Sequence, residues 1–209
     1  MCKRHGGMPF DFVCLTENSE GLISKIKVKS LPRIAVQGWW MKPWMFSAEL
    51  GFTGDVLFLD LDLVLCSNID KLWTYNPEDD FVIIRDFTRH QNPTWQKFNS
   101  SVIRFRAEKY HWIWDDFLNN HRSIMPKNHG DQDYLYSLLK DKGKYWPDSW
   151  IQSYKWEMRD KRDIVPINGK RNFVSIKDPR VEPDLCIAVF HGDPNPEEVK
   201  DPWVITNWQ

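Results

Sequence analysis

The sequence has little of what marks secreted, membrane-spanning or nucleic-acid-binding proteins. Its four cysteines, Cys2, Cys14, Cys66 and Cys186, lie far apart and form no C-x-x-C pair. We therefore expect reduced, mostly buried thiols in a reducing compartment such as the cytoplasm, not disulfides or a zinc site. No stretch approaches the roughly 18 apolar residues of a membrane span, and no apolar signal-peptide core stands near the N-terminus. The 28 basic and 29 acidic residues nearly balance, which argues against a nucleic-acid partner.

The order of the remaining patterns indicates an α/β fold. A chain of 209 residues can bury a substantial core, and we expect one domain over residues 1–209. Apolar strand patterns alternate with helical spacing, as in a sheet flanked by helices. The expected strands are 10–15, 55–60, 81–85, 97–106, 164–167 and 185–191, and the expected helices are 40–50, 68–73, 108–119 and 131–140. Most of the 12 tryptophans are expected in the core, although indole faces also stack well on sugar rings.

Asp60 and Asp62 form the most informative local pattern. They lie within the run DVLFLDLDLVL, whose residues 56–59 are apolar on both faces, as in a central parallel strand covered by helices. Such strands carry chemistry at their carboxyl ends. Side chains at i and i+2 of an extended chain point to the same side, so the two carboxylates would converge on one hard cation. A solvated turn is the alternative, but the apolar residues on either side make an unpaired charge costly.

Several segments occur in an order that resembles one enzyme family. They are 58–62 (FLDLD) followed by 68–73 (NIDKLW), then 98–102 (FNSSV), 131–135 (DQDYL), and His191-Gly192 before a proline-rich turn. Together they resemble the metal-dependent, nucleotide-sugar glycosyltransferases of the GT-A fold, especially the galactosyltransferase and glycogenin-like group. The resemblance implies a mixed, mostly parallel sheet flanked by helices. It also implies retaining transfer of a hexose from a nucleotide diphosphate sugar, a UDP-sugar, to an acceptor hydroxyl.

The same resemblance assigns roles to individual residues. A divalent cation, Mn²⁺ or Mg²⁺, would bridge the donor diphosphate and neutralise the charge that builds on it as the sugar leaves. Carboxylate and imidazole ligands suit manganese, and an amide offers donors and an acceptor to sugar hydroxyls. The implied metal ligands are Asp60, Asp62 and His191, the implied donor-binding residues are Lys42, Asn99 and Gly192, and the implied catalytic residues are Asp131 and Gln132.

The acceptor that the resemblance implies is a glycan, a lipid-linked sugar or a protein. A lipid-linked acceptor would require peripheral contact with a membrane. Lys25, Lys27 and Lys29 form only a weak basic stripe for such contact.

The sequence departs from this family in three places. Residues 1–9 are too short for the strand and helix that hold uracil and ribose in the family, so the N-terminal strand–helix unit is expected to be incomplete. Asn195 stands where related sequences often carry a lysine or arginine that binds the diphosphate. The metal and Lys42 or Arg171 would therefore have to neutralise more of the negative charge of the diphosphate. Ser101 replaces a frequent glycine, which would narrow the sugar pocket.

Two other functions fit parts of the pattern. Residues 60–65 (DLDLVL) also match the opening motif of haloacid-dehalogenase-type phosphatases, in which the first Asp is the nucleophile and the second an acid/base. That motif normally opens the fold, whereas here it begins at residue 60, and the nearest later Gly-Asp pair, Gly130-Asp131, fits the transferase better. The other alternative is a degenerate transferase module that binds carbohydrate through tryptophan platforms without turnover.

Overall fold

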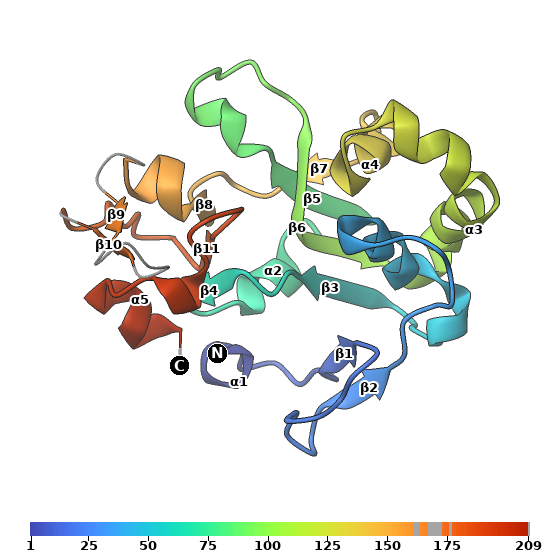
Figure 1. Ribbon diagram of the computed structural model, residues 1–209, viewed down its shortest axis with the longest axis horizontal. Helices are drawn as coiled ribbons and strands as arrows, with labels where there is room; N and C mark the ends of the chain where they lie inside the picture. Colours follow the sequence, from blue (N-terminus) through green and yellow to red (C-terminus); the bar gives the residue numbers. More distant parts are fainter. Residues whose placement is uncertain (161–163, 167–172, 176, 209) are drawn as a thin grey trace.

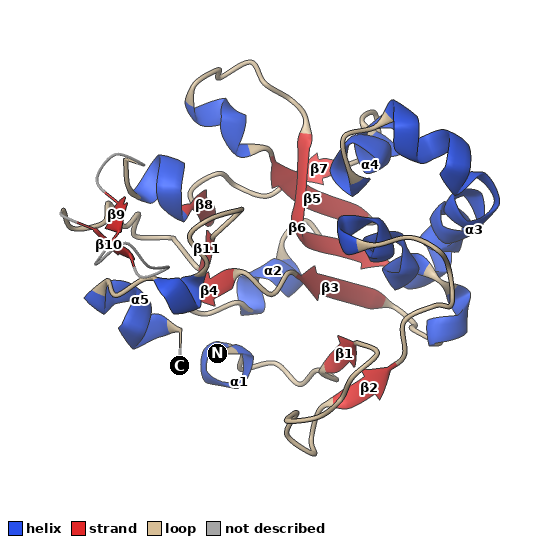
Figure 2. Cartoon of the chain, viewed as in Figure 1, coloured by secondary structure: helices blue, strands red, loops and turns tan. Residues whose placement is uncertain are grey.

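Two mixed β-sheets and the helices around them make up the body of the molecule (Figures 1 and 2). The computed structural model describes residues 1–160, 164–166, 173–175 and 177–208. Its strands are β1 (Val13–Leu15), β2 (Lys27–Lys29), β3 (Asp55–Leu59), β4 (Leu63–Leu65), β5 (Phe81–Arg85), β6 (Phe98–Arg106), β7 (Lys144–Tyr145), β8 (Ile151–Ser153), β9 (Ile164–Pro166), β10 (Phe173–Ser175) and β11 (Ile187–Val189). Its α-helices are α1 (Cys2–His5), α2 (Asp70–Thr74), α3 (Ala107–Ile124), α4 (Asp131–Leu139) and α5 (Pro202–Asn207). The short 3-10 helices are η1 (Gly38–Phe46), η2 (Ala48–Leu50), η3 (Phe87–His90), η4 (Met125–Lys127) and η7 (Pro196–Glu198), and η5 (Tyr154–Met158) is a π-helix.

The first sheet has the strand order β3-β6-β5-β7 and confirms a mixed α/β fold. β6 pairs antiparallel with β3 and β5, and β5 pairs parallel with β7. The expectation of a central parallel strand over residues 56–59 is wrong, because in the described part of the chain β3 pairs with β6 alone, at the sheet edge. Its apolar side chains are divided between two cores: Val56 and Phe58 pack against one cluster, Leu57 and Leu59 against another. This alternation explains a run that is apolar on both faces.

The second sheet has the order β4-β11-β8, and its strand β4 follows β3 of the first sheet in the chain. β11 pairs antiparallel with β4 and parallel with β8. β4 and β11 are buried along their whole length. β3 leads directly into β4 across the centre of Figure 1, so the chain crosses from one sheet to the other at Asp60–Leu61–Asp62.

The tryptophan-rich segment before β3 is helical, as predicted, but it forms the 3-10 helices η1 and η2. Pro43 lies inside η1 and has no N–H to donate. The side chain of Ser47 caps η2 by accepting a hydrogen bond from the Glu49 N–H, and Gly51 ends η2 with φ of 65°. Glycine tolerates this left-handed conformation, which agrees with its predicted role as a stop.

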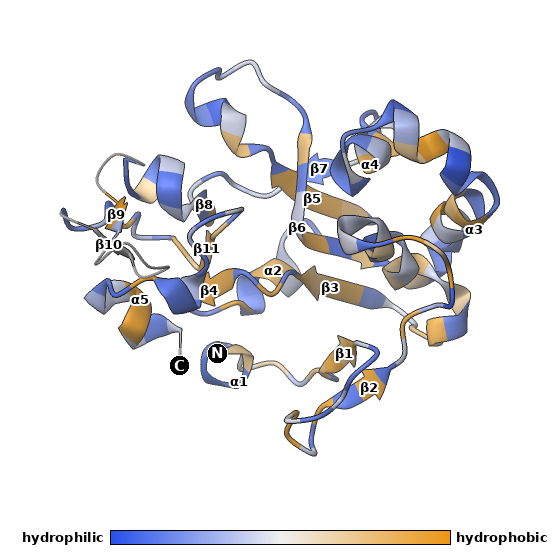
Figure 3. Ribbon diagram, viewed as in Figure 1, coloured by the Kyte–Doolittle hydropathy of each residue, from blue (hydrophilic) through white to orange (hydrophobic). Residues whose placement is uncertain are grey.

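Aromatic packing joins η1 to α3 over the first sheet. Trp40 stacks on Phe117 with ring centroids 5.8 Å apart, and Trp44 meets Trp114 edge to face at 5.0 Å. Figure 3 shows hydrophobic colours along β3 and β5 and mixed colours along α3 and α4. The prediction that most of these tryptophans belong to the core is confirmed for this cluster.

The short elements are those that the sequence located least well. The expected strand 10–15 is reduced to β1, and β9 covers the described part of the expected strand 164–167, whose last residue lies outside the described residues. β7 and β8 were not predicted, because strands of two or three residues show no periodicity. Within the described residues, no helix has both the length and the apolar character needed to cross a membrane.

All four cysteines are free thiols, as the sequence predicts. The expectation that most of them are buried is wrong, because Cys186 is buried and the other three are half-buried. Burial raises the pKa of Cys66 to about 11 and that of Cys186 to about 12. Both thiols are therefore protonated and weakly nucleophilic at neutral pH.

Arg104 on β6 holds the connection between α2 and β5. The residue is only 2% exposed. Its guanidinium donates to the carbonyl oxygens of Leu72 and Trp73 at 2.9 and 3.2 Å, and to those of Asn76 and Asp79 at 2.9 and 3.2 Å. One side chain thus satisfies acceptors that the irregular backbone leaves unpaired.

We expect Arg104→Met to lower the free energy of unfolding by about 3 kcal/mol, because several backbone acceptors lose a charged donor. Urea unfolding followed by circular dichroism measures this. Lys109→Ala is the control, since its ion pair with Asp80 lies at the surface and should contribute less than about 1 kcal/mol. Similar losses in the two variants would contradict the role of Arg104.

Candidate active site

The link between β3 and β4 carries the two predicted metal-binding carboxylates. The Asp60 N–H donates to the Ser101 carbonyl at 2.9 Å, and the Asp62 carbonyl accepts from the Phe190 N–H at 2.9 Å. Each end of the link is therefore tied to a different sheet. Leu61 is 94% exposed and faces solvent, whereas Asp60 and Asp62 are partly buried. The alternation agrees with two carboxylates on the inner side of the link.

Lys42 of η1 lies among the site carboxylates. Its ammonium donates to Asp60 Oδ2 at 2.7 Å and to Ser100 Oγ at 3.1 Å, and it lies 3.9 Å from Asp131 Oδ2. Burial alone would lower the pKa of Lys42, but the charges of Asp131 and Asp60 outweigh burial, and the pKa is raised. Lys42 is thus a firmly charged cation bound to carboxylates. The sequence predicted a phosphate-binding role for it.

A β-bulge brings Ser100 into this cluster. Ile83 pairs with Ile103 but Ile84 pairs with Asn99, so extra residues of β6 loop out between these pairs. The Asn99 side-chain oxygen accepts a hydrogen bond from the Ser101 N–H at 3.1 Å and so braces the bulge. Bulges next to active sites commonly redirect a side chain in this way. Asn99, predicted to bind the donor sugar, is 7% exposed and has this local partner.

Asp131 begins α4 and is the most deeply buried carboxylate of the cluster. Its side chain is 5% exposed, and its Oδ2 accepts no hydrogen bond within the described residues. Burial raises the pKa of Asp131, and the charge of Lys42 opposes part of that rise. Gln132, the other predicted catalytic residue, follows it half-buried in the first turn. Asp133 pairs with Lys97 at 3.1 Å, away from the cluster.

Asp62 lies in the field of both a carboxylate and an ammonium group. Burial and the charge of Asp60 raise the pKa of Asp62, and the charges of Lys42 and Lys155 oppose that rise. The effect of the Asp60 charge on Asp62 indicates that the two carboxylates are near neighbours. Sequence reasoning missed Lys155, because it lies in no motif and is placed on the π-helix η5 that directly follows β8.

His191 follows β11 and lies within an aromatic box. Its ring stacks on Phe87 at 5.2 Å and meets Trp156 edge to face at 4.6 Å. Its Nε2 is 2.6 Å from the hydroxyl oxygen of Ser153, another residue that the sequence did not reveal. Among the described residues, no three His, Cys, Asp or Glu side chains already lie together as a metal-binding group. A cation held by Asp60, Asp62 and His191 together therefore stays a prediction.

The loop after His191 is held by Lys155. The ammonium of Lys155 donates to the His191 carbonyl and, at 2.6 Å, to the Asp193 carbonyl. Gly192 has φ of 66°, a conformation that suits glycine, and a Cβ there would lie 3.6 Å from Lys155 Nζ. Asn195 forms a capping box with Glu198 at η7. Arg171, the other cation considered for the diphosphate, lies outside the described residues.

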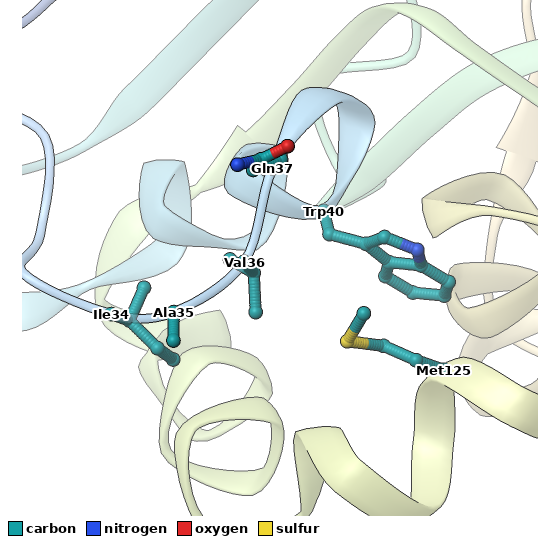
Figure 4. Close-up of a pocket in the computed structure, with 6 residues that line it drawn as sticks. All are labelled: Ile34, Ala35, Val36, Gln37, Trp40 and Met125. Atoms are coloured by element: carbon teal, nitrogen blue, oxygen red, sulfur yellow. The ribbon is translucent and has the colours of Figure 1, made fainter.

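A separate cavity of about 500 Å³ opens beneath the start of η1 (Figure 4). Val36, Trp40 and Met125 point toward a common space there. The lining residues are Ile34, Ala35, Val36, Gln37, Trp40 and Met125. No predicted site residue is among them, so this cavity is distinct from the carboxylate cluster.

Comparison with known proteins defines the class of fold. No family model matches the sequence, and a search of curated proteins finds no match. The fold matches solved structures of glycosyltransferases, and it is of the GT-A type.

Three of these structures carry the comparison. The glycosyltransferase GlyE of Streptococcus pneumoniae TIGR4 has a TM-score of 0.56 and 16% identity, covering 82% of this chain and 42% of that one. An active-site mutant of LgtC has a TM-score of 0.54 and 15% identity, covering 83% and 69%. The galactosyltransferase LgtC with donor and acceptor sugar analogs has a TM-score of 0.51 and 13% identity, with the same coverage. The chain therefore spans less than half the length of GlyE and about two thirds of LgtC.

We expect Asp131→Asn to raise the free energy of unfolding at neutral pH by roughly 0.5–2 kcal/mol. Folding raises the pKa of Asp131 above 3.8, so the charged carboxylate at neutral pH costs stability. That cost disappears at a pH low enough for Asp131 to be protonated in both the folded and the unfolded protein. Urea unfolding across the acidic range should show the gain shrinking as pH falls toward 3.8.

Asp133→Asn is the matched control, because it neutralises the neighbouring partly exposed carboxylate of the same helix. No gain is expected from it. An Asp131→Asn variant less stable than the wild type at neutral pH would contradict the cost assigned to the buried charge.

Proposed function

We propose that the chain is a glycosyltransferase that moves a hexose from a nucleotide diphosphate sugar, a UDP-sugar, to an acceptor hydroxyl with retention of configuration. The observation that carries the proposal is the cluster of Asp60, Asp62 and Asp131 around the partly buried Lys42, at the junction of two sheets of a GT-A fold. Such concentrated negative charge suits a cation-bound diphosphate and the positive charge that develops on the departing sugar. The acceptor in this proposal is a glycan, a lipid-linked sugar or a protein.

Asp60 and Asp62 would hold the divalent cation, Mn²⁺ or Mg²⁺. Burial and the charge of Asp60 raise the pKa of Asp62, so a positive partner there is favourable, and hard cations bind carboxylate oxygen. His191 would complete the set as the cation binds, with Ser153 as the outer partner that orients its ring. When bound, the cation would neutralise the charge that builds on the departing diphosphate.

Other residues of the chain would bind and orient the two substrates. Lys155 of η5 supplies a positive charge close to Asp62, and it contacts the loop on which Asn195 supplies none. Asp131 Oδ2, which accepts no hydrogen bond from the described residues, offers an acceptor for a sugar hydroxyl, and Gln132 lies beside it on α4. Because Lys42 contacts both Asp60 and Asp131, it fixes the spacing between the cation and the sugar.

The comparisons do not favour the phosphatase alternative, since the similar solved structures are glycosyltransferases. A degenerate module without chemistry would bind saccharide independently of metal. The transferase should instead bind its donor only with the divalent cation, and this difference separates the two.

Asp60→Ala and Asp62→Ala should abolish Mn²⁺-dependent turnover of UDP-sugars, a loss of at least about 100-fold, while circular dichroism shows the fold largely intact. The assay is release of UDP from a panel of UDP-hexoses, with and without Mn²⁺. Asp55→Asn is the control, because this carboxylate lies on the same strand and pairs with Arg106 at the surface. Unchanged turnover in both alanine variants would refute the metal assignment.

Lys42→Met should lower the stability of the metal-free protein by about 3 kcal/mol, because Asp60 and Asp131 lose their shared counter-charge. Added Mn²⁺ should then raise the melting temperature of the variant more than that of the wild type, since no ammonium competes for Asp60. Thermal unfolding with and without Mn²⁺ measures both effects.

Lys97→Met serves as the control, because Lys97 pairs with Asp133 and its side chain is 44% exposed. Its response to Mn²⁺ should equal that of the wild type. An equal or smaller response of Lys42→Met would contradict a cation at Asp60.

A further inference from the structure

Trp39 differs from its tryptophan neighbours on η1. Trp39 is 56% exposed, whereas Trp40 and Trp44 are 8% and 6% exposed. Burial of the other two indoles is explained by their packing against α3. An indole left largely in water beside a polar cluster is the kind of surface that ligands use.

The geometry of η1 directs Trp39 toward the carboxylate cluster. In a 3-10 helix the side chains at i and i+3 eclipse one another, so Trp39 and Lys42 leave η1 on the same side. Lys42 on that side contacts Asp60 and Asp131. A second contact agrees: a Cβ built on Gly130 would lie 3.4 Å from Trp39 ring atoms, so the indole lies against the residue that immediately precedes Asp131.

These contacts connect the groups one to the next, and this series is called the row below. Asp62 and Asp60 stand at one end, Lys42 joins Asp60 to Asp131, and Trp39 stands at the other end against Gly130. In a nucleotide sugar the sugar and the nucleoside are attached to different phosphates of the diphosphate. With the diphosphate at Asp60 and Asp62 and the reacting sugar at Asp131, Trp39 lies on the sugar side, where an acceptor must approach.

Asp131 supplies the polar group that such an acceptor needs. Its buried Oδ2 accepts no hydrogen bond within the described residues. A buried acceptor atom that lacks a donor costs free energy, and a sugar hydroxyl in the site would satisfy it. An apolar indole face next to a carboxylate oxygen with an open lone pair matches a pyranose ring, which has an apolar C–H face and hydroxyls at its edge.

We propose that Trp39 is the stacking platform for the acceptor saccharide, which presents a hydroxyl toward Asp131. This inference rests on the proposed transferase function, which places the donor at the other end of the row. Trp39 would thus determine acceptor affinity and leave donor binding unchanged.

The test compares Trp39→Ala and Trp39→Phe with Trp112→Ala. Trp112 is the matched control, since it is 40% exposed on α3 and has no contact with the cluster among those described. Binding of methyl glycosides of glucose, galactose and mannose is measured by saturation-transfer NMR, and binding of UDP with Mn²⁺ by calorimetry. Trp39→Ala should weaken glycoside binding about tenfold, and Trp39→Phe should weaken it less, because a phenyl ring still stacks. UDP affinity should be the same in all variants, which also shows that they fold.

Three results would overturn the assignment of Trp39. The first is a glycoside affinity of Trp39→Ala equal to that of the wild type. The second is a loss of UDP affinity in Trp39→Ala as large as its loss of glycoside affinity, which would make the indole a nucleobase platform. The third is absence of glycoside binding in the wild type. Failure of the proposed function gives a different result. A wild type that binds no UDP with Mn²⁺ would remove the transferase, whereas a glycoside signal lost only in the Trp39 variants would still assign this residue to a saccharide site.

Discussion

The ion pair between Lys42 and Asp60 is the contact on which the site depends. It joins η1 to the end of β3, and through Asp131 and Ser100 it also reaches α4 and the bulge of β6. Without a positive charge at this point, several partly or fully buried carboxylates would repel one another in a region with little water. One ammonium therefore keeps four elements of the fold in register around a strongly acidic cluster.

The cluster lies where several irregular backbone segments meet. The chain changes sheets at Asp60–Leu61–Asp62, β6 bulges at Ser100, and Gly192 turns with positive φ beside Lys155. At two of these places a polar side chain contacts Lys42: Asp60 at the change of sheets and Ser100 at the bulge. Irregular backbone lowers stability locally, and the large aromatic core between η1 and α3 offsets that loss. This pattern is typical of functional sites.

The sequence predicted the parts of this site that depend on local pattern. Asp60 and Asp62 follow from an apolar run with two acids at i and i+2, whereas Asp131 was assigned a role only through the family resemblance. Lys155 and Ser153 were not predictable, because they reach His191 only through the parallel pairing of β8 with β11. The edge position of β3 was missed for a related reason: a strand that divides its side chains between two cores has the same pattern as a central one.

The most direct test of the central claim is a crystal of the protein grown with Mn²⁺ and UDP, with anomalous scattering recorded near the manganese edge. The account predicts an anomalous peak within roughly 2.6 Å of carboxylate oxygens of both Asp60 and Asp62, with the ammonium of Lys42 displaced from Asp60. Ordered UDP with no manganese at these carboxylates, or manganese bound elsewhere, would contradict it.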